Sequence, residues 1–258
     1  MTQKEAFKEL LRLAHDRSIC LTAWEDDYHK GGRYRDVEWN QSLLYYQKGQ
    51  SKKEVVNDVL MRLTWADFPK SLRQKENEKK LTHLLLTAGA DPNLEDCGDS
   101  LFVTFVKKDR VGPALEIAEH PDFHFPRGNE NTVFDTLSYN ISSNTMHHPC
   151  YNWIKRQQKE LPSWAKDEKK ELQKRLPEAL KYHEIWQKES KDLIYLLFQK
   201  GIYPQYDAEL FQYLAPVVLE RDPEFFEKKK QQVIRQITRA KTPIQIYNAI
   251  MGQEKEKS

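Results

Sequence analysis

Apolar residues recur along most of the chain at spacings of three and four, which is the pattern of amphipathic helices. Residues 1–15 follow it, residues 55–60 repeat it, and residues 101–106 carry apolar side chains on one helical face. Glycine accounts for only 9 of the 258 residues, which argues against a fold with many tight β-turns. The pattern therefore predicts a mostly α-helical protein.

Two of the predicted helices end in the same way. The segment LLLTAGADPN, residues 84–93, runs apolar up to Gly89 and continues into an Asp-Pro-Asn turn. Residues 193–205, LIYLLFQKGIYPQ, end at Gly201 and again place a proline three residues later. Glycine is the residue best suited to the left-handed conformation that closes a helix. We therefore expect Gly89 to hold a positive φ angle.

Helix starts recur at a fixed step as well. Ser100 and Thr132 are predicted helix N-caps that lie 32 residues apart, and an apolar pair follows each of them. Ser42, followed by two leucines, supplies a third opening nearer the start of the chain. A hydroxyl side chain at these positions can accept a hydrogen bond from the first turn of the helix. The step predicts a helical repeat, because one repeat class has a period of about 33 residues.

These features resemble the ankyrin repeat. The sequence GADPN at residues 89–93 matches the closing turn of that family, and GQSKKEVV at residues 49–56 matches the start of its second helix. The openings depart from the family because they lack its proline and histidine. The resemblance covers most of residues 40–215 and implies helix pairs that bury each other's apolar faces on stacking. It also implies that hairpin tips and first helices bind a protein partner.

The repeat pattern divides the chain unevenly. Residues 71–89 are too few for two helices and a turn, so that unit is expected to have a shortened or fused first helix. The return helix of the unit opened by Thr132 is expected to start near Glu184, which makes residues 145–183 an insertion. The expected organisation is an N-terminal helix and loop cap (1–40), ankyrin-like repeats (41–144), a helical insertion (145–183), a last ankyrin-like unit (184–218) and a C-terminal helical cap and tail (219–258).

Charge and cysteine content constrain the setting. The chain has 41 basic and 39 acidic residues, a formal net charge of +2, which does not favour nucleic acid as a partner. The three cysteines, Cys20, Cys97 and Cys150, are odd in number and widely spaced, so free thiols in a reducing compartment are expected. No apolar run approaches the roughly 18 residues that span a bilayer. We expect a cytoplasmic protein, or one that a specialised secretion system delivers into a host cytosol.

Two segments carry residues that could do chemistry. MHHPC, residues 146–150, places His147, His148 and Cys150 together, as a zinc site or a Cys–His nucleophile pair would require. However, adjacent histidines cannot easily ligate one ion, and no second Cys or His pair follows at zinc-module spacing, so a polar loop is the favoured interpretation. Residues 25–36 combine carboxylates from Glu25 onward with His29, which could serve acid–base catalysis; a solvated or partner-facing loop is favoured. No metal or cofactor is expected.

The insertion carries a run of charge. Residues 155–175 hold eight basic and four acidic side chains, a local net charge of +4. A basic helix can bind nucleic acid or an anionic membrane. A solvated helix face stabilised by neighbouring opposite charges is the favoured interpretation.

The expected function is that of a protein-binding module. Irregular repeats with a long insertion resemble ankyrin-like effectors of intracellular bacteria. The alternative is an enzyme whose catalytic residues lie in the non-repeat segments, within Glu25–Asp36 or His147–Cys150. The candidate partner-binding residues are Glu95, Asp96 and Asp99 in the first tip, Arg127, Asn129 and Glu130 in the second, and Trp24 and Trp39 as aromatic anchors.

Overall fold

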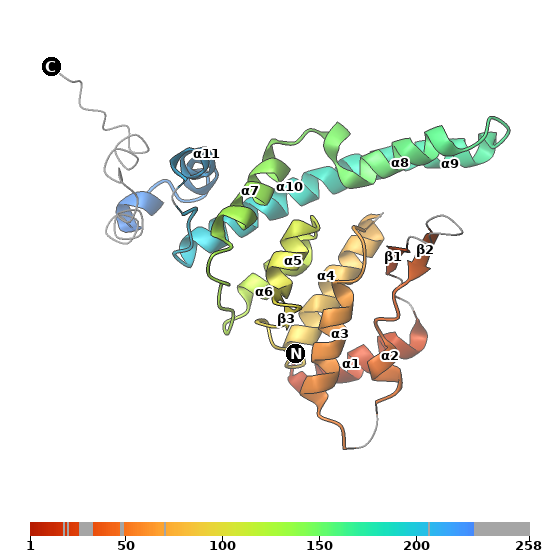
Figure 1. Cartoon of the computed structure of the whole chain (residues 1–258), viewed down its shortest axis with the longest axis horizontal. Coiled ribbons are helices and arrows are strands. Elements are labelled where there is room, and N and C mark those ends of the chain that lie inside the picture. Colours follow the sequence, from red (N-terminus) through yellow and green to blue (C-terminus); the bar gives the residue numbers. More distant parts are fainter. Residues whose placement is uncertain are drawn as a thin grey trace.

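The computed structural model describes residues 1–17, 19, 21–25, 33–46, 49–69, 71–205 and 207–229, without the side chains of residues 22–25, 33–36 and 208. These residues form a mostly helical protein, so the all-α fold class is confirmed (Figure 1). His29, Cys20 and most of the C-terminal cap lie outside the described residues. Among the described residues, no helix is both long and apolar enough to cross a membrane.

The elements follow one another from α1 to α11. In the first half they are α1 (Gln3–Asp16), β1 (Thr22–Glu25), β2 (Arg33–Asp36), α2 (Gln41–Leu44), α3 (Lys52–Leu63), α4 (Leu72–Thr87), β3 (Glu95–Asp96), β4 (Asp99–Ser100), α5 (Leu101–Lys107) and α6 (Val111–Glu119). In the second half they are α7 (Glu130–Ser142), the 3₁₀ turn η1 (Thr145–His147), α8 (Pro149–Glu160), α9 (Lys166–Lys174), α10 (Leu176–Gln199) and α11 (Ala208–Leu219).

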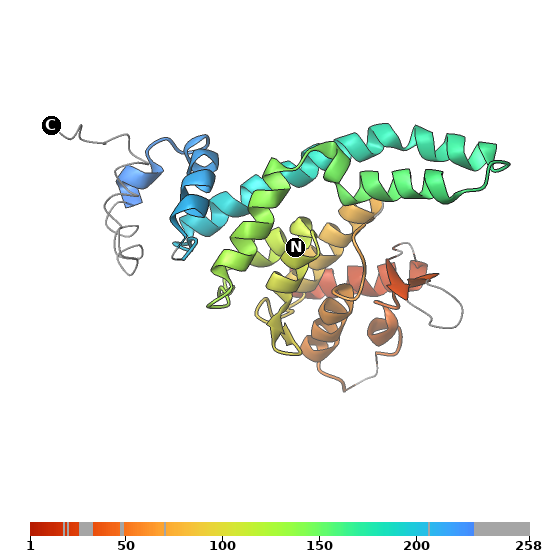
Figure 2. The ribbon, with the colours of Figure 1, turned by 45° about the horizontal axis from the view of Figure 1, so that its top comes forward.

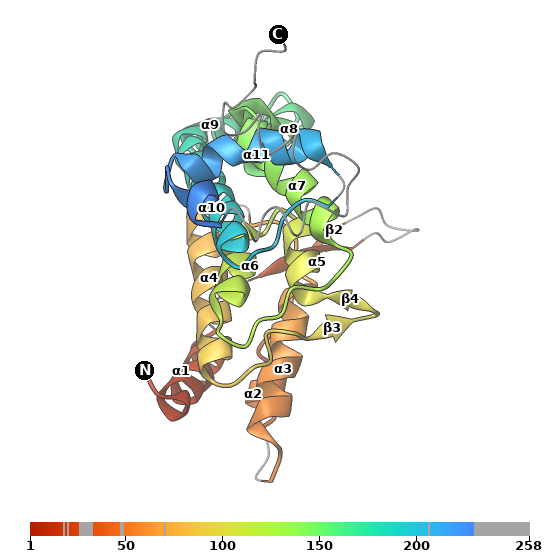
Figure 3. The same ribbon diagram turned by 90° about the vertical axis from the view of Figure 1, so that its left-hand side faces the viewer.

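The helices lie in two adjacent rows. Figure 3 shows α4, α6 and α10 side by side in one row and α3, α5 and α7 in the next. Helix α6 packs between α4 and α10, α7 packs between α5 and α11, and α1 lies on the outer side of α4. Helices also pair across the rows: α3 with α4, α5 with α6, and α7 with α10, which follows it after the insertion. Helices α5, α6, α7 and α10 therefore bury their apolar faces against neighbours in both rows.

One core runs through the rows. Apolar side chains from successive helices join a single cluster of buried residues, and Leu196 is partly buried against it. The cluster includes Leu84, Leu85, Phe102, Phe105, Phe134, Leu137 and Leu197. Burying a side chain of this size contributes about 1.5–3 kcal/mol. The short helix α5 has five of its seven residues buried, because it is covered by a helix of its own row and by its partner in the other.

We call the two rows of helices together the stack. Three of its helices end in the same hydrogen-bonded closure. Gly89 has φ +101°, and Ala90 N donates to Leu85 O at 3.0 Å. The end of α10 repeats this arrangement at Gly201, which has φ +77°. The prediction for Gly89 is therefore confirmed, and both closures have the Schellman pattern. Helix α5 closes in the same way at Asp109, which has φ +57°. Because this position is not a glycine, nothing in the sequence indicated the closure.

The helix starts differ from the prediction at two of three positions. Helix α7 begins at Glu130 after Asn129, so Thr132 lies inside it. Helix α2 is a four-residue helix that follows Asn40, so Ser42 also lies inside a helix. Ser100 does precede α5, but its side chain makes no capping hydrogen bond. At α5 the first helical N–H, that of Leu101, donates to the backbone carbonyl of Leu94 at 3.0 Å.

Residues 71–89 contain one helix, α4, which starts after the N-cap Ser71, in line with the expected shortened or fused unit. Helix α3 packs against both α2, the first helix expected for its own unit, and α4.

Two further segments differ from expectation. Helix α10 starts at Leu176 rather than near Glu184, and it continues without a break from the insertion into the stack. Buried residues on both sides of position 184, from Ala179 to Trp186, hold this helix in one piece. In the N-terminal cap, where a loop was expected, β1 and β2 pair antiparallel with Thr22 opposite Asp36.

Candidate interaction surface

Three loops follow α4, α6 and α10 and are joined by asparagine side chains. Asn93, after α4, donates from Nδ2 to Asp122 O at 2.8 Å and accepts from His124 N at 2.7 Å. Asp122 and His124 belong to the loop that follows α6. One side-chain amide thus replaces a pair of backbone hydrogen bonds between two loops that lie about 30 residues apart in sequence.

The next pair of loops is joined in the same way. Asn131, at the start of α7, donates from Nδ2 to Gln205 O at 2.7 Å and accepts from Gln205 N at 2.7 Å. Gln205 in turn donates from Nε2 to a carboxylate oxygen of Glu130 at 2.9 Å. We call residues 91–100, 120–131 and 201–205 the loop edge. Both bridges fix the backbone of the loop edge without using its outermost exposed side chains, Glu95, Asp99 and Arg127, which we call the crest.

The β3–β4 hairpin is the most prominent part of the loop edge and projects beyond the second row of helices (Figure 3). Its turn consists of Cys97 at φ +53° and Gly98 at φ +87°, the two positive φ angles that a tight hairpin turn of type I′ requires. Glu95 and Asp99 are exposed, and Asp96 is half-buried. The hydrogen bond between the Cys97 thiol and Asp96 raises the pKa of that thiol.

The predicted residues of the second tip have different environments. Arg127 is exposed and Asn129 is half-buried. Glu130 is only 8% exposed, and its carboxylate accepts the hydrogen bond from Gln205. Glu130 therefore holds two loops together, and little of its side chain is left accessible to a partner.

The two predicted aromatic anchors are not equivalent. Trp39 is 2% exposed and donates from Nε1 to Ile19 O at 3.0 Å. It belongs to the core beside α1 and α2, so it cannot anchor a partner at the surface. Trp24 lies on β1, and the position of its side chain is not among the described ones.

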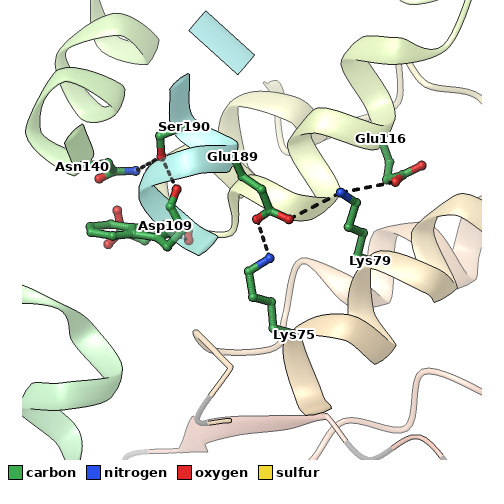
Figure 4. Close-up of polar contacts among 8 residues, drawn as sticks. Lys75, Lys79, Asp109, Glu116, Asn140, Glu189 and Ser190 are labelled. Atoms are coloured by element: carbon green, nitrogen blue, oxygen red, sulfur yellow. Dashed lines mark hydrogen bonds and ion pairs between the residues drawn. The ribbon is translucent and has the colours of Figure 1, made fainter. Parts of the chain in front are cut away.

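Buried charges join α4 to α6 and α10. Lys75, Lys79 and His83 follow one another at four-residue spacing on one face of α4. Lys75 pairs with Glu189 of α10, and Lys79 lies 3.4 Å from the same carboxylate (Figure 4). Glu116 of α6 lies 3.9 Å from Lys79 Nζ and 2.9 Å from His83 Nδ1. Charges of alternating sign therefore run from the interior to the surface and tie three helices of one row together.

A second ion pair is buried completely. Arg110 pairs with Glu78 of α4 and donates to Ala66 O at 2.9 Å. Burial raises the pKa of Glu78, and Arg110 partly opposes this rise. Since both side chains are withdrawn from water, the pair stabilises the stack only as long as both partners are present.

A third polar cluster lies where α5, α7 and α10 meet. The Asn140 side chain lies between Asp109 and Ser190 (Figure 4). With its amide turned so that the nitrogen meets acceptors, Asn140 donates to Asp109 Oδ1 at 3.2 Å and to Thr136 O at 3.0 Å. Burial raises the pKa of Asp109 to about 6. These three clusters act within the stack, and their chemistry is that of holding helices in place.

The segment around His148 lies in the core and is not a polar loop. His148 is fully buried among the rings of Phe68, Tyr182 and Trp186. Burial lowers its pKa to about 3, so the imidazole is neutral at physiological pH. Cys150 is 2% exposed, so of the three candidate residues in this segment only His147 is exposed. A Cys–His nucleophile pair here would lie beneath aromatic side chains and out of reach of a substrate.

The other candidate for chemistry is only partly described. Glu25 and Asp36 lie on β1 and β2, at opposite ends of the two-stranded pairing, and His29 lies outside the described residues. Within the described part of the chain, no group of three or more His, Cys, Asp or Glu side chains is arranged to hold a metal ion.

A shallow hollow lies between α2 and α3. It has a volume of about 350 Å³ and is open to solvent. Asp58 lines it, accepting hydrogen bonds from Ser42 and, at 2.7 Å, from Arg62 Nε. Its carboxylate is therefore engaged within the protein. The aromatic residue at this hollow is Tyr45, which is 71% exposed.

The chain matches no protein-family model, no curated protein sequence and no solved structure. The functional assignment therefore depends on the geometry of the loop edge and of the other exposed elements.

Proposed function

We propose that this protein is a protein-binding module built on an ankyrin-like stack, and that its partner docks on the loop edge and the adjacent first helices. Two observations support the ankyrin-like assignment. Helix pairs lie in two rows, and the closing sequence GADPN of residues 89–93 forms a Schellman closure followed by a projecting hairpin. An ankyrin-like stack offers its partners this combination of tips and first helices.

The observation that carries the proposal is the pair of asparagine bridges. Asn93 and Asn131 each hold two successive loops in register. A surface whose backbone is already ordered loses less conformational entropy when a partner binds. The bridges leave Glu95, Asp99 and Arg127 exposed along the crest. These three side chains can supply charge complementarity and specificity.

The proposed setting is a reducing cytosol, in keeping with the exposed thiol of Cys97 at the hairpin turn. The irregular units and the inserted helices resemble those of ankyrin-like bacterial effectors. We therefore include in the proposal that the protein regulates a host protein after delivery into the host cytosol.

The test reverses charge on the hairpin. The variant Asp96→Lys with Asp99→Lys is compared with wild type in cross-linking pull-downs, followed by affinity measurement with the captured protein. We expect affinity to fall about tenfold or more, because the new lysines would face the basic groups of the partner that complement the acidic hairpin. The melting temperature should change little, because exposed ion pairs such as Asp99–Lys107 contribute about 0–1 kcal/mol.

The matched control carries the same change of charge on the other row of helices. Glu76 of α4 and Glu184 of α10 are both exposed, and changing them to Lys should leave affinity within about twofold. Equal losses in both variants would indicate a general effect of net charge. Unchanged binding in the hairpin variant would place the docking surface away from the loop edge.

A further inference from the structure

The insertion forms an arm that extends beyond the stack. Helix α8 runs outward, and α9 with the first turns of α10 runs back beside it (Figure 1; Figure 2). We call residues 149–181 the arm. Of residues 149–174, all of which the structure describes, only Cys150, Ile154 and Ala165 are buried. Because so few side chains of α8 and α9 are buried, separating these two helices from α10 costs less than unfolding the stack.

The base of the arm is held by one side chain, that of His148. It lies immediately before α8 and is 0% exposed. The rings of Phe68, Tyr182, His183 and Trp186 surround it, with ring centres 4.9 to 5.5 Å from its own. We call these four rings the ring cage. Phe68 precedes α4 and the other three belong to α10, so His148 fastens the start of α8 to two segments of the stack.

The ring cage gives the imidazole no polar partner. Among the described residues, neither Nδ1 nor Nε2 of His148 has a hydrogen-bond partner, and Nδ1 of His183 has none either. A buried polar atom without a hydrogen bond is unfavourable, and a positive charge at the same place is far more so. The ring cage therefore accepts the imidazole only in its neutral form.

We propose that His148 is an acid-sensitive latch: its protonated imidazole is incompatible with the ring cage, so acidification releases α8 and α9 from α10. Release leaves the apolar face of α8 around Ile154 and that of α10 around Ala179 uncovered, since both residues belong to the core of the closed arm. The latch adds a conformational response to the proposed function and does not depend on the partner of the loop edge.

A hinge for this movement lies between α7 and α8. Gln187 of α10 donates from Nε2 to Ser143 O at 2.9 Å and to Ile141 O at 3.2 Å, which holds the end of α7 on α10. Residues 144–147 follow, and three of these four are exposed. When His148 leaves the ring cage, α8 can therefore turn about residues 144–147 while α7 keeps its place.

The titratable groups of α8 and α10 do not favour the protonated form. Burial and, to a lesser extent, the charge of His183 lower the pKa of His148 to about 3. Burial lowers the pKa of His183 as well, and Glu184 partly opposes this. Burial raises the pKa of Tyr182, and the thiol of Cys150 acts on the same hydroxyl. None of these groups supplies a negative charge to a protonated His148.

The charged groups around Phe68 and on α4 are engaged elsewhere. Lys75 lies 6.0 Å from the ring centre of Tyr182 and pairs with Glu189. Glu78 pairs with Arg110. The carboxylate of Asp67, next to Phe68, acts on Lys108. Within the described surroundings, these carboxylates therefore do not offset the cost of a buried imidazolium.

Acid acts in opposite directions on the latch and on the stack. Below the ordinary histidine pKa of about 6.5, the open arm binds a proton that the closed arm excludes, and this continues down to about 3. The equilibrium constant for opening therefore rises about tenfold per pH unit in this range, or about 25-fold between pH 7 and pH 5. In the stack, burial raises the pKa of Asp109 to about 6, so acidification favours its folded state.

The test measures hydrogen exchange of the full chain by mass spectrometry at pH 7 and pH 5, with each rate divided by its intrinsic rate at that pH. Amides of α8 report on the arm, and amides of α5 and α6 report on the stack. We expect protection of α8 to fall about 25-fold and that of α5 and α6 to change by less than about fivefold, because Asp109 opposes the histidines in global unfolding. An equal fall in all three helices would overturn the latch in favour of global unfolding.

Two variants assign the effect to one residue. His148→Phe keeps a ring in the ring cage but cannot be protonated, so the change in α8 protection should fall below about fivefold, with the remainder supplied by His183. The matched control is His147→Phe at the exposed neighbour, which should keep the full change. A 25-fold change that persists in His148→Phe would refute the role of His148.

Nuclear magnetic resonance of wild type tests the same point without a variant. The Hε1 resonance of His148 is followed from pH 7.5 to pH 5 in protein with labelled histidine. We expect no titration of the closed arm in this range, because its imidazole stays neutral. A resonance that titrates near pH 6.5 while the amides of α8 remain protected would show that the closed ring cage accepts the proton, and would overturn the proposal.

Discussion

The stack and the arm (residues 149–181) both contain many lysines and glutamates, but in different surroundings. In the stack, the Lys75 side chain is 7% exposed and pairs with a buried carboxylate on a neighbouring helix. In the arm, the Lys174 side chain is 61% exposed and pairs with an exposed carboxylate, that of Glu171, on the same helix. A lysine between helices neutralises a buried charge and fixes their arrangement, whereas an exposed ion pair within one helix contributes about 0–1 kcal/mol to stability. The surroundings, and not the residue type, decide how much a lysine stabilises the fold.

The largest expected effect comes from unpairing the buried ion pair of the stack. Arg110→Ala should destabilise the protein by about 3–5 kcal/mol, because it leaves the Glu78 carboxylate buried without a partner. Urea denaturation measures this, and Lys170→Ala in the arm should cost less than about 0.5 kcal/mol. Replacing both Arg110 and Glu78 by Met should recover most of the loss. A single variant as stable as wild type would show that water reaches Glu78.

Truncation of the apolar core comes next. Leu85→Ala should cost about 2–5 kcal/mol, because Leu85 is fully buried and its removal leaves a cavity. Leu180→Ala in the arm is the matched change at a residue that is 47% exposed, and it should cost well under 1 kcal/mol. Thermal unfolding compares the two. Similar losses at both sites would mean that the arm folds as part of the same core.

A smaller effect should depend on pH. Burial raises the pKa of Asp109 to about 6, so its contribution to stability is fully present below the unfolded value near 3.9 and is lost as pH rises through about 6. Asp109→Asn should therefore stabilise the protein by about 1–3 kcal/mol at pH 7 relative to its effect at pH 4.

The control for this change is Asp167→Asn on the arm, where the carboxylate is exposed. Its effect on unfolding should not vary with pH by more than a few tenths of a kcal/mol. If the two variants have the same pH profile, the Asp109 carboxylate is solvated rather than buried.

The smallest expected effect is local to one closure. Gly89 has φ +101°, and a β-branched residue is strained in that conformation, so Gly89→Val should cost about 1–2 kcal/mol. Gly89→Asn should cost less, since asparagine tolerates positive φ. The change in melting temperature should follow this order. Equal melting temperatures for all three proteins would show that the helix does not close at this residue.

Features that depend on neighbouring residues could be predicted from the sequence. The apolar spacing of residues 101–106 marks a helix because a helix face repeats every three to four residues. Gly89 and Gly201 mark closures because few other residues accept positive φ. The step of 32 residues between Ser100 and Thr132 was less informative, because Thr132 lies inside α7 and does not start it.

Features that depend on contacts between distant residues required the tertiary structure. Trp39 and Glu130 are buried because other segments cover them, which no local pattern indicates. Asn93 and Asn131 are ordinary loop residues in the sequence, and they become bridges only because stacking brings successive loops side by side.

The arm shows the same division most clearly. The sequence alone predicted a helical insertion whose residues 155–175 are rich in lysine. It did not determine which side chains of α8 and α9 lie side by side, because that depends on contacts between the two helices such as the one from Gln158 to Gln173. Spacing along one helix is a local property of the backbone, whereas the alignment of two helices is decided by side-chain contacts across the space between them.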